Sequence, residues 1–353
     1  MSGPAELIGR VDSALATFLA ERSRSLSKVG PELAPVAATA SAFVLDGGKR
    51  LRPSFAYWGW RSAAPSGDDT AFVTAAASLE LLHACALVHD DVMDASDTRR
   101  GRPAAHAAFT RLHREAGWTG DADVFGTAAA ILLGDLLLSW ADAMFATAGL
   151  DPPVQPGTRR VYDDMRELVM AGQYLDVLVQ ARGGFSVADA LRVAEFKTGK
   201  YTVEGPLHFG AAAAGAGPAT FAALSAYGLP LGEAFQLRDD ILGVFGDPSR
   251  TGKPAGGDLR EGKRTLLVAL AMDHADRAQA DLLRAQLGNR QMAEQTVAAL
   301  RDVIVSTGAL ALVEQRIADR GLEARHALRS AALSADAVPA LDALAVAATE
   351  RST

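Results

Sequence analysis

Apolar residues recur every three or four positions through most of this chain, and this helical periodicity limits its fold more than any other feature. Alternating β-branched runs are scarce, and aromatic residues are only 6% of the sequence. We predict helices over the following segments: Glu6–Arg22, Ala71–Asp94, Gly126–Ala148, Gly157–Gln180, Ser186–Gly199, Ala222–Phe245, Thr265–Ala275, Asp281–Gln286, Met292–Ser306 and Leu310–Ser334. No linker or internal repeat divides the chain, so we expect one all-α domain over residues 1–353, with disorder only near residues 1–5 and 350–353.

The balance of charge disfavours some classes of function. The chain has 35 Lys and Arg against 42 Asp and Glu, a net charge of −7, which would repel the phosphate backbone of a nucleic acid. Its one cysteine, Cys85, rules out an intrachain disulfide and suits a reducing compartment, so we expect a cytoplasmic protein. The longest uncharged stretch, Gly205–Gly232, contains three prolines. We therefore expect two short helices around a turn at Gly215–Pro218 and no membrane span.

An acidic group ends the apolar segment Leu81–Asp94. Asp90 and Asp94 are four residues apart, so both carboxylates lie on the same face of a helix. Like charges on one face require a compensating cation, and carboxylate oxygens together with phosphate oxygens suit Mg²⁺. A solvated acidic helix end is the alternative interpretation.

A second acidic pair, Asp239-Asp240, ends another apolar segment, and a glycine-rich stretch with Lys253 follows it. Glycines allow backbone and lysine groups to approach a phosphate closely. Basic residues also accompany glycines in GGKRLRP (47–53) and DTRRGRP (97–103). Each cluster alone is typical of a solvated surface. Taken together, the acidic helix ends and basic turns predict a site for a diphosphate held partly through Mg²⁺ and partly directly.

Five motifs occur in a fixed order along the chain: GGKRLRP, HDDVMD with DTRRGRP, GQ at Gly172-Gln173, KT at Lys197-Thr198, and FQLRDDILGVFGD with GKP. In this order they resemble the trans-type polyprenyl diphosphate synthases. The resemblance implies a single large helical bundle of the isoprenoid synthase type around a central active-site cavity, and a homodimer. It implies head-to-tail condensation of isopentenyl diphosphate with an allylic diphosphate (dimethylallyl, geranyl or farnesyl), with loss of diphosphate.

The resemblance also implies roles for individual residues. The metal ligands would be Asp90, Asp94 and Asp239. They would hold three Mg²⁺ ions together with the bound diphosphate. The contacts to the allylic diphosphate would come from Arg99, Lys197, Thr198, Gln236 and Lys253. The isopentenyl diphosphate would be gripped by Lys49, Arg52, His83 and Arg100. The residues expected to be catalytic are Asp90, Asp94, Asp239, Arg99 and Lys197.

One position departs from the family pattern. Gly243 stands where a third Asp of the second acidic motif is common, while Asp239 and Asp240 remain. We expect the direct ligand Asp239 to be kept, with the change confined to an outer-shell contact. Gln173 is expected to give polar support near the allylic diphosphate.

Product length is expected to depend on the helix that carries Asp90. Ala86, Cys85 and Leu82 lie about 6 to 12 Å back from Asp90 along this helix, at 1.5 Å per residue. Family members that stop at C15 commonly carry bulky aromatic residues four or five positions before the first Asp, where this chain has Ala86 and Cys85. We therefore predict a C20 product, geranylgeranyl diphosphate, with longer chains as the alternative.

Two other functions fit part of the pattern. A class I terpene cyclase also ionises an allylic diphosphate with Mg²⁺, but Asp239, Gly243 and Asp247 occupy the spacing of its second motif without the hydroxyl or the Glu. A non-catalytic partner subunit of another synthase is favoured only by Gly243. The cluster implied for a second substrate favours chain elongation.

Three residues near these motifs have plainer interpretations. Cys85 is expected to be a small packing residue rather than a nucleophile, because it lies mid-helix. His89 either orients a neighbouring group or is a structural, hydrogen-bonded histidine. Trp58 and Trp60 are expected to pack between helices or against a dimer partner.

Overall fold

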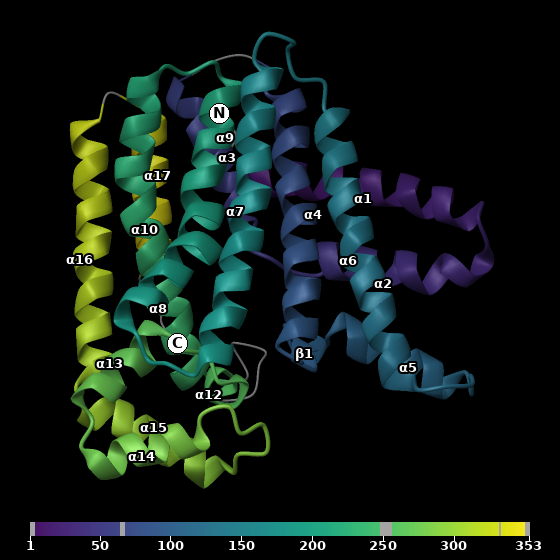
Figure 1. Cartoon of the computed structure of the whole chain (residues 1–353). Helices are drawn as coiled ribbons and strands as arrows, with labels where there is room; N and C mark the ends of the chain where they lie inside the picture. The colour runs from purple at the N-terminus through teal and green to yellow at the C-terminus, as the bar shows by residue number, and fades with distance from the viewer. Residues whose placement is uncertain (1–3, 64–67, 248–255, 332, 350–353) are drawn as a thin grey trace. The chain divides into compact units, whose positions relative to one another are not determined.

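The computed structural model describes residues 4–63, 68–247, 256–331 and 333–349, and in these ranges the chain is almost entirely helical (Figure 1). The prediction of an all-α fold is confirmed. The described helices form two compact units, unit 1 (Met1–Val161 and Pro206–Ala216) and unit 2 (Tyr162–Gly205 and Gly217–Thr353). That the chain is one domain stays a prediction. Residues 4 and 5, expected at a disordered end, begin a helix, and the rest of the predicted disorder lies outside the described residues.

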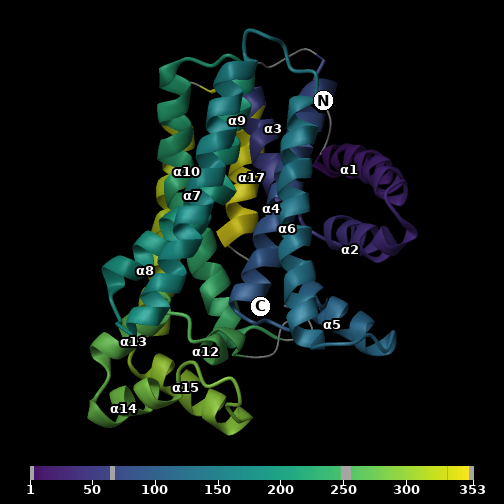
Figure 2. The same ribbon diagram turned by 45° about the vertical axis from the view of Figure 1, so that its right-hand side comes forward.

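Unit 1 is built around two long helices, α4 (Thr70–Met93) and α6 (Ala122–Ala146), which lie side by side (Figure 1; Figure 2). Its other elements are α1 (Pro4–Ser27), η1 (Pro31–Leu33), α2 (Ala34–Leu45), α3 (Leu51–Ala63), the strands β1 (Thr98–Arg99) and β2 (Arg102–Pro103), α5 (Ala105–Glu115) and α9 (Gly205–Ala213). A Cβ atom at Gly134 of α6 would overlap Nε2 and Cδ2 of the His89 ring and lie 2.7 Å from its Cε1. Only glycine therefore lets α6 approach α4 this closely.

An aromatic layer joins α3, α4, α6 and α9 within unit 1. Trp60 stacks on Phe72 with ring centroids 5.4 Å apart, and Phe209 lies 6.1 Å from Phe72 and 5.6 Å from Phe145. Trp58 and Trp60 are both buried. These contacts support the expectation that the tryptophans pack between helices.

Unit 2 is built around α10 (Pro218–Phe245) and α16 (Ala309–Ser330), which also lie side by side (Figure 1). It also contains most of α7 (Gln155–Arg182), together with α8 (Val187–Val193), the π-helical segment η2 (Ala194–Glu204), α12 (Gly257–Glu261), α13 (Leu266–His274), α14 (Arg277–Gln286), α15 (Glu294–Ser306) and α17 (Ala337–Thr349). Arg238 of α10 donates two hydrogen bonds of 2.7 Å to Glu314 of α16, a bidentate pair that fixes the two helices together.

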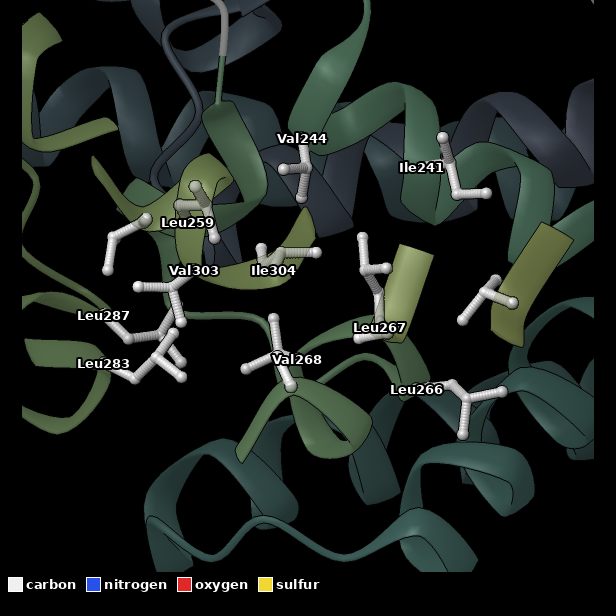
Figure 3. Packing of buried hydrophobic residues seen from close by; sticks show 14 of the residues in the cluster. Ile241, Val244, Leu259, Leu266, Leu267, Val268, Leu283, Leu287, Val303 and Ile304 are labelled. Carbon is white, nitrogen blue, oxygen red and sulfur yellow. The ribbon is translucent and has the colours of Figure 1, made fainter. Parts of the chain in front are cut away.

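The core of unit 2 collects branched aliphatic side chains from α10, α12, α13, α14 and α15 (Figure 3). Ile241 and Val244 contribute from the last turns of α10, and Leu259 contributes from α12. Arg301 caps α10, because its Nε donates to the carbonyl oxygen of Val244 at 2.7 Å. The acidic end of α10 is thus held on a rigid base.

Some helices are apolar enough to raise the question of a membrane. Within the described residues, α4 and α6 are long and apolar enough to cross one by length and composition, with 72% and 39% of their most apolar windows buried. The uncharged stretch Gly205–Gly232 forms α9 and the start of α10 around a turn, as predicted. The expected lack of a membrane span stays a prediction.

Candidate active site

The first acidic motif forms the end of α4 in unit 1. Asp90, Asp91 and Asp94 are all buried, at 9%, 0% and 6% of full exposure. The Asp94 N–H donates to the Asp90 carbonyl oxygen at 2.8 Å, so the last helical turn continues to Asp94. Buried carboxylates are stable only with a compensating charge or hydrogen bonds, so this helix end depends on its neighbours.

Arg99 supplies that charge. Its Nε lies 2.9 Å from Oδ1 of Asp91, its Nη2 also contacts Asp91, and Nη2 reaches Oδ2 of Asp90 at 3.3 Å. The arginine is placed by a tight β1–β2 hairpin in which Arg100 and Gly101 take left-handed φ values of 53° and 73°. Asp91 was not among the predicted site residues, because the four-residue spacing selects Asp90 and Asp94.

The basic turn before α3 lies against this hairpin. Nη1 of Arg100 donates to the carbonyl oxygen of Gly47 at 3.1 Å, so residues 47–53 and 97–103 meet in unit 1, as a shared site requires. Arg50 has a structural role, because it is buried and pairs with Glu80 at 2.9 Å and with Asp12 at 2.7 Å. Lys49 remains exposed on the same turn.

His83 lies on α4 two turns before Asp90, at a small cleft. The cleft is lined by Phe43, Val44, Arg50, Glu80, His83, Ala84, Leu87 and Arg100. Burial lowers the pKa of His83 well below its ordinary value, and the positive charges of Arg52, Arg100 and Arg99 lower it further. The imidazole is therefore neutral near pH 7, in a positively charged surrounding that suits an anion.

Cys85 and His89 have structural roles. Burial raises the pKa of the Cys85 thiol to about 12, so the thiol stays protonated, which agrees with a packing residue. Nε2 of His89 lies 3.1 Å from the carbonyl oxygen of Ile131 on α6, and its Nδ1 lies 3.9 Å from Sγ of Cys85. These contacts favour the structural interpretation of His89.

In unit 2, Lys197 and Thr198 lie on the π-helical segment η2, between α7 and α10. A Cβ atom at Gly172 of α7 would lie 2.6 Å from Cα of Lys197, and one at Gly232 of α10 would lie 2.6 Å from Cα of Gly199. Both helices therefore touch the backbone of η2, and only glycine allows this. π-Helical turns are frequent at functional sites. The glycine of the GQ motif thus has a packing role that fixes the position of Lys197.

Lys197 is held by Asp176. Its Nζ lies 2.6 Å from Oδ2 of Asp176, whose Oδ1 accepts a hydrogen bond of 3.1 Å from Gln180. Gln173, three residues before Asp176 on α7, is half-buried. Sequence reasoning did not assign Asp176 a role, although its position one turn after Gln173 was a usable signal.

The second acidic motif ends α10. Asp239 is exposed and Asp240 is buried, and Nε2 of Gln236 donates to Oδ1 of Asp240 at 2.6 Å. Burial raises the pKa of Asp240 well above its usual value, and repulsion from Asp258 and Asp239 raises it further, against the hydrogen bond from Gln236 and the charge of Lys263. In the structure Gln236, predicted to contact diphosphate, bonds to Asp240. The predicted ligand Lys253 lies outside the described residues.

The carboxylates of the acidic motifs suit a divalent ion that is bound by a diphosphate as well as by the protein. A Cβ atom at Gly243 would overlap Oδ2 of Asp258 and lie 2.7 Å from its Oδ1, so acidic oxygens crowd the end of α10. Among the described residues, no three or more His, Cys, Asp or Glu side chains converge to hold a metal on their own. Mg²⁺ commonly takes only one or two carboxylates and completes its shell with phosphate oxygens and water.

Comparison with known proteins identifies the family. The family model described as Polyprenyl synthetase matches residues 34–304. Geranylfarnesyl diphosphate synthase of Aeropyrum pernix is 35% identical over 301 residues, covering 84% of this chain and 86% of that protein.

Solved structures agree. Geranylgeranyl pyrophosphate synthase from Corynebacterium glutamicum, complexed with isoprenyl diphosphate and magnesium, matches with a TM-score of 0.94 at 41% identity, over 97% of this chain and 98% of that one. Polyprenyl synthase from Caulobacter crescentus, complexed with calcium and isoprenyl diphosphate, matches with a TM-score of 0.81 at 29% identity, over 100% and 99%. The chain therefore belongs to the polyprenyl synthetase family, and its predicted resemblance to the trans-type polyprenyl diphosphate synthases is confirmed.

Proposed function

We propose that this protein is a Mg²⁺-dependent prenyltransferase that joins isopentenyl diphosphate head to tail with an allylic diphosphate and makes the C20 product. The observation that carries the proposal lies on α4. Its end carries the buried carboxylates Asp90 and Asp94, and about 10 Å further back the neutral His83 lies among arginines. One helix thus serves two anions, one held through a metal and one held directly, as a two-substrate condensation needs.

The allylic diphosphate would be bound at the acidic ends of α4 and α10. Asp90, Asp94 and Asp239 would hold Mg²⁺, three ions with the diphosphate bound, whose charge would stabilise the negative charge that grows on the leaving group. Arg99 would exchange its contact with Asp91 for a phosphate oxygen, since an arginine fork matches both groups. The same diphosphate would be contacted by Lys197, Thr198, Gln236 and Lys253. The magnesium and isoprenyl diphosphate of the C. glutamicum structure support this assignment.

The isopentenyl diphosphate would be bound by Lys49, Arg52, His83 and Arg100. As the allylic C–O bond breaks, the isopentenyl double bond forms the new C–C bond to the allylic carbon. The proton then lost from the isopentenyl unit would go to the departing diphosphate, so the reaction requires no general base from the protein. The apolar helices would exclude water, which would otherwise quench the cation.

The length of the product would be set along α4. Leu82 and Cys85 are buried and Ala86 is half-buried, and the two small residues Cys85 and Ala86 stand five and four positions before Asp90. A growing tail could pass this level, which favours C20 over C15. The C. glutamicum relative, named for a geranylgeranyl product, supports the same length.

The decisive experiment combines purified protein, Mg²⁺ and isopentenyl diphosphate with each allylic primer in turn, and reads product size by mass spectrometry. We expect geranylgeranyl diphosphate. A hydrocarbon formed from geranylgeranyl diphosphate alone would indicate a terpene cyclase instead. If no isopentenyl diphosphate is consumed with any primer, the partner-subunit function is favoured. A product of another length would retain the activity and refute only the C20 assignment.

We also propose that a second copy of the chain covers α6. An apolar stripe of this helix is exposed, with Val124 and Leu132 each at 67% and Ile131 at 44%. Asp135 lies in the same stripe with 62% of its side chain exposed, and a carboxylate there would be costly in lipid. A protein partner therefore fits this face better than a membrane, which supports the homodimer that we propose, in the cytoplasm.

Light scattering tests this proposal. The protein should have the mass of a dimer, and Leu132→Glu should give a monomer, whereas Leu322→Glu, at a 62% exposed leucine of α16, should not. The proposal that a second copy covers α6 would be refuted if the unmodified protein is a monomer. It would also be refuted if the protein is recovered with membranes after fractionation.

A further inference from the structure

Arg50 takes a backbone conformation that residues with side chains rarely adopt. Its φ is 48°, in the left-handed region, and it follows Gly47 and Gly48, whose φ values are 95° and 117°. Glycine takes a positive φ without strain, whereas arginine does so at a steric cost. Such strain persists only where the surrounding structure holds the residue, and it is common at functional sites. The contacts of the Arg50 side chain supply that hold.

Two acids from different helices bind the guanidinium group of Arg50. Its Nη1 donates to Oε2 of Glu80 on α4 at 2.9 Å, and its Nε donates to Oδ1 of Asp12 on α1 at 2.7 Å. The side chains of Arg50 and Glu80 are only 3% and 5% exposed, whereas that of Asp12 is 45% exposed. Arg50 and Glu80 therefore form a buried ion pair, and Asp12 holds the arginine from the surface side.

Glu80 lies beside basic groups that could bind an anion. It precedes His83 by one turn of α4 and lines the same small cleft as His83 and Arg100. A Cβ atom at Gly48 would lie 3.1 Å from Nη1 of Arg50 and 3.6 Å from Nη2 of Arg100, so both guanidinium groups reach this glycine. Glu80, Arg50 and Arg100 thus meet at one place in unit 1.

The charge of Glu80 acts on this place. Burial lowers the pKa of Arg100, the negative charge of Glu80 raises it, and the positive charges of neighbouring arginines, Arg50 among them, lower it. Glu80 therefore reduces repulsion between the arginines. An uncompensated carboxylate there would also repel a diphosphate bound to them. Arg50 compensates Glu80 directly, while the charge of the half-exposed Asp12 is screened by water.

We propose that Arg50 is a positioning residue for isopentenyl diphosphate, which neutralises Glu80 beside the anion site and is held in place by Asp12 of α1. This inference rests on the proposed function, because it concerns the basic cluster assigned to that substrate. Arg50 acts through Glu80 and not by contact with the substrate, since its Nε and Nη1 are bonded to the two acids. The first helix of the chain thereby contributes to the affinity for one of the two substrates.

The test removes each charge of the buried pair and then both. Arg50→Gln leaves Glu80 without its arginine, and Glu80→Gln removes the carboxylate charge but keeps a hydrogen-bond acceptor. Arg50→Gln/Glu80→Gln removes both charges, and Arg50→Lys keeps the positive charge. Asp12→Ala removes the outer acid, and Glu21→Ala, at an exposed acid of the same helix, is its matched control.

Two measurements separate binding from turnover. Titration calorimetry with isopentenyl diphosphate alone gives its dissociation constant, because no condensation occurs without an allylic diphosphate. Steady-state kinetics with both substrates give kcat and the KM of each diphosphate. Thermal melting reports whether each variant is folded.

We expect Arg50→Gln to weaken isopentenyl diphosphate binding by about 10-fold or more, because a buried negative charge is left beside the site. The KM of isopentenyl diphosphate should rise with it, and the KM of the allylic diphosphate should change little. Glu80→Gln should bind at least as tightly as the unmodified protein, and the double variant should recover most of the loss. Arg50→Lys should lie between Arg50→Gln and the unmodified protein.

The surface acid should have a smaller effect. Asp12→Ala is expected to weaken isopentenyl diphosphate binding by about 2- to 5-fold, as for a solvent-exposed ion pair, and Glu21→Ala should leave it unchanged. Normal binding by Asp12→Ala would overturn the inference, because Arg50 would not need α1.

The buried pair gives sharper outcomes. Equal losses of binding in Arg50→Gln and Glu80→Gln would overturn the inference, because the pair would then be a structural link without an effect of charge. Normal binding by a folded Arg50→Gln would overturn it as well. If Arg50→Gln does not fold, Glu80→Gln and the double variant decide, and weak binding by either in the folded state refutes the role of Arg50.

The unmodified protein separates this inference from the proposed function. If it binds isopentenyl diphosphate and condenses it while the variants fail these expectations, the proposed function stands and only the role of Arg50 is refuted. If the unmodified protein neither binds nor condenses isopentenyl diphosphate, the proposed function itself fails, and the role of Arg50 fails with it.

Discussion

The ends of α4 and α10 carry the same Asp-Asp pattern in very different surroundings. At the end of α4, Asp91 is fully buried and Arg99 pairs with it through more than one contact. At the end of α10, repulsion from Asp258 and Asp239 contributes to the raised pKa of Asp240. At the first end a buried carboxylate is thus paired with an arginine, and at the second a buried carboxylate lies among like charges. The same motif therefore places its buried carboxylate beside an opposite charge in one unit and beside like charges in the other.

The largest effect should come from removing the exposed ligand at the end of α10. Asp239→Ala is expected to lower kcat by about 10²- to 10³-fold, because charge stabilisation of the leaving diphosphate is lost. Single-turnover kinetics with saturating substrates measure it. Near-normal condensation would remove Asp239 from the metal site.

The second prediction concerns the free energy of unfolding. Removing one charge should change it in opposite directions at the ends of α4 and α10. Arg99→Gln should lower the free energy of unfolding by about 3 kcal/mol or more, because it removes the arginine that pairs with the buried Asp91 carboxylate. Asp258→Asn should instead raise it slightly, because it relieves repulsion on Asp240. Urea unfolding of both variants without metal makes the comparison.

Arg99→Gln/Asp91→Asn supplies the control. It removes the buried carboxylate charge together with its arginine partner, so it should recover much of the lost stability. Equal and like-signed changes in the two single variants would show that the two ends do not differ in charge balance.

The third prediction asks whether the product tail follows α4. Cys85→Phe or Ala86→Phe should shift the main product from C20 to C15, because an aromatic ring would fill the path just before Asp90. Ala298→Phe, at an exposed position of α15 in unit 2, is the matched control. Mass spectrometry measures the product length. An unchanged length in both α4 variants would show that positions 85 and 86 do not limit the product.

The smallest effect concerns pH. His83 is kept neutral in the folded protein by a pKa well below the ordinary value, whereas in the unfolded chain it binds a proton at about pH 6.5. The unfolded state therefore binds more protons below that pH, and the free energy of unfolding should fall as pH drops from about 6.5. His83→Gln should flatten this part of the stability curve. If the free energy of unfolding of His83→Gln falls with pH as steeply as that of the unmodified protein, another group is responsible for the pH dependence.

Long amphipathic helices could be predicted from the sequence, and several shorter ones could not. The predicted segment Ala71–Asp94 corresponds closely to α4, because its periodicity continues over many turns. α3 was not predicted, since most of its residues are buried and it has no polar face from which a period could be read. The predicted helix Ser186–Gly199 covers only the first part of the π-helical segment and gives no sign of its π geometry. Gly172 and Gly232, distant in sequence, bring α7 and α10 onto the backbone of this segment.

The residues of the candidate site also differ in how far they could be predicted from the sequence. The motif residues were predicted from type, spacing and order, which are local properties. The partners that position them were not. The β1–β2 hairpin turns Arg99 back to Asp91, and the packing of η2 on α7 brings Lys197 to Asp176, and neither can be read from residue spacing. Asp258 lies fifteen residues beyond Gly243, and its place against that glycine follows from the packing of α12 on α10.

The pairing of Arg99 with Asp91 also matters for handling the protein. A domain whose acidic residues are balanced only by metal unfolds when a chelator removes that metal. Here the guanidinium group belongs to the chain itself, so Asp91 keeps its counterion in a buffer without metal or phosphate. Purification and storage in EDTA should leave unit 1 folded, and preparations stripped in this way provide a clean starting point for adding back magnesium, manganese or calcium in known amounts.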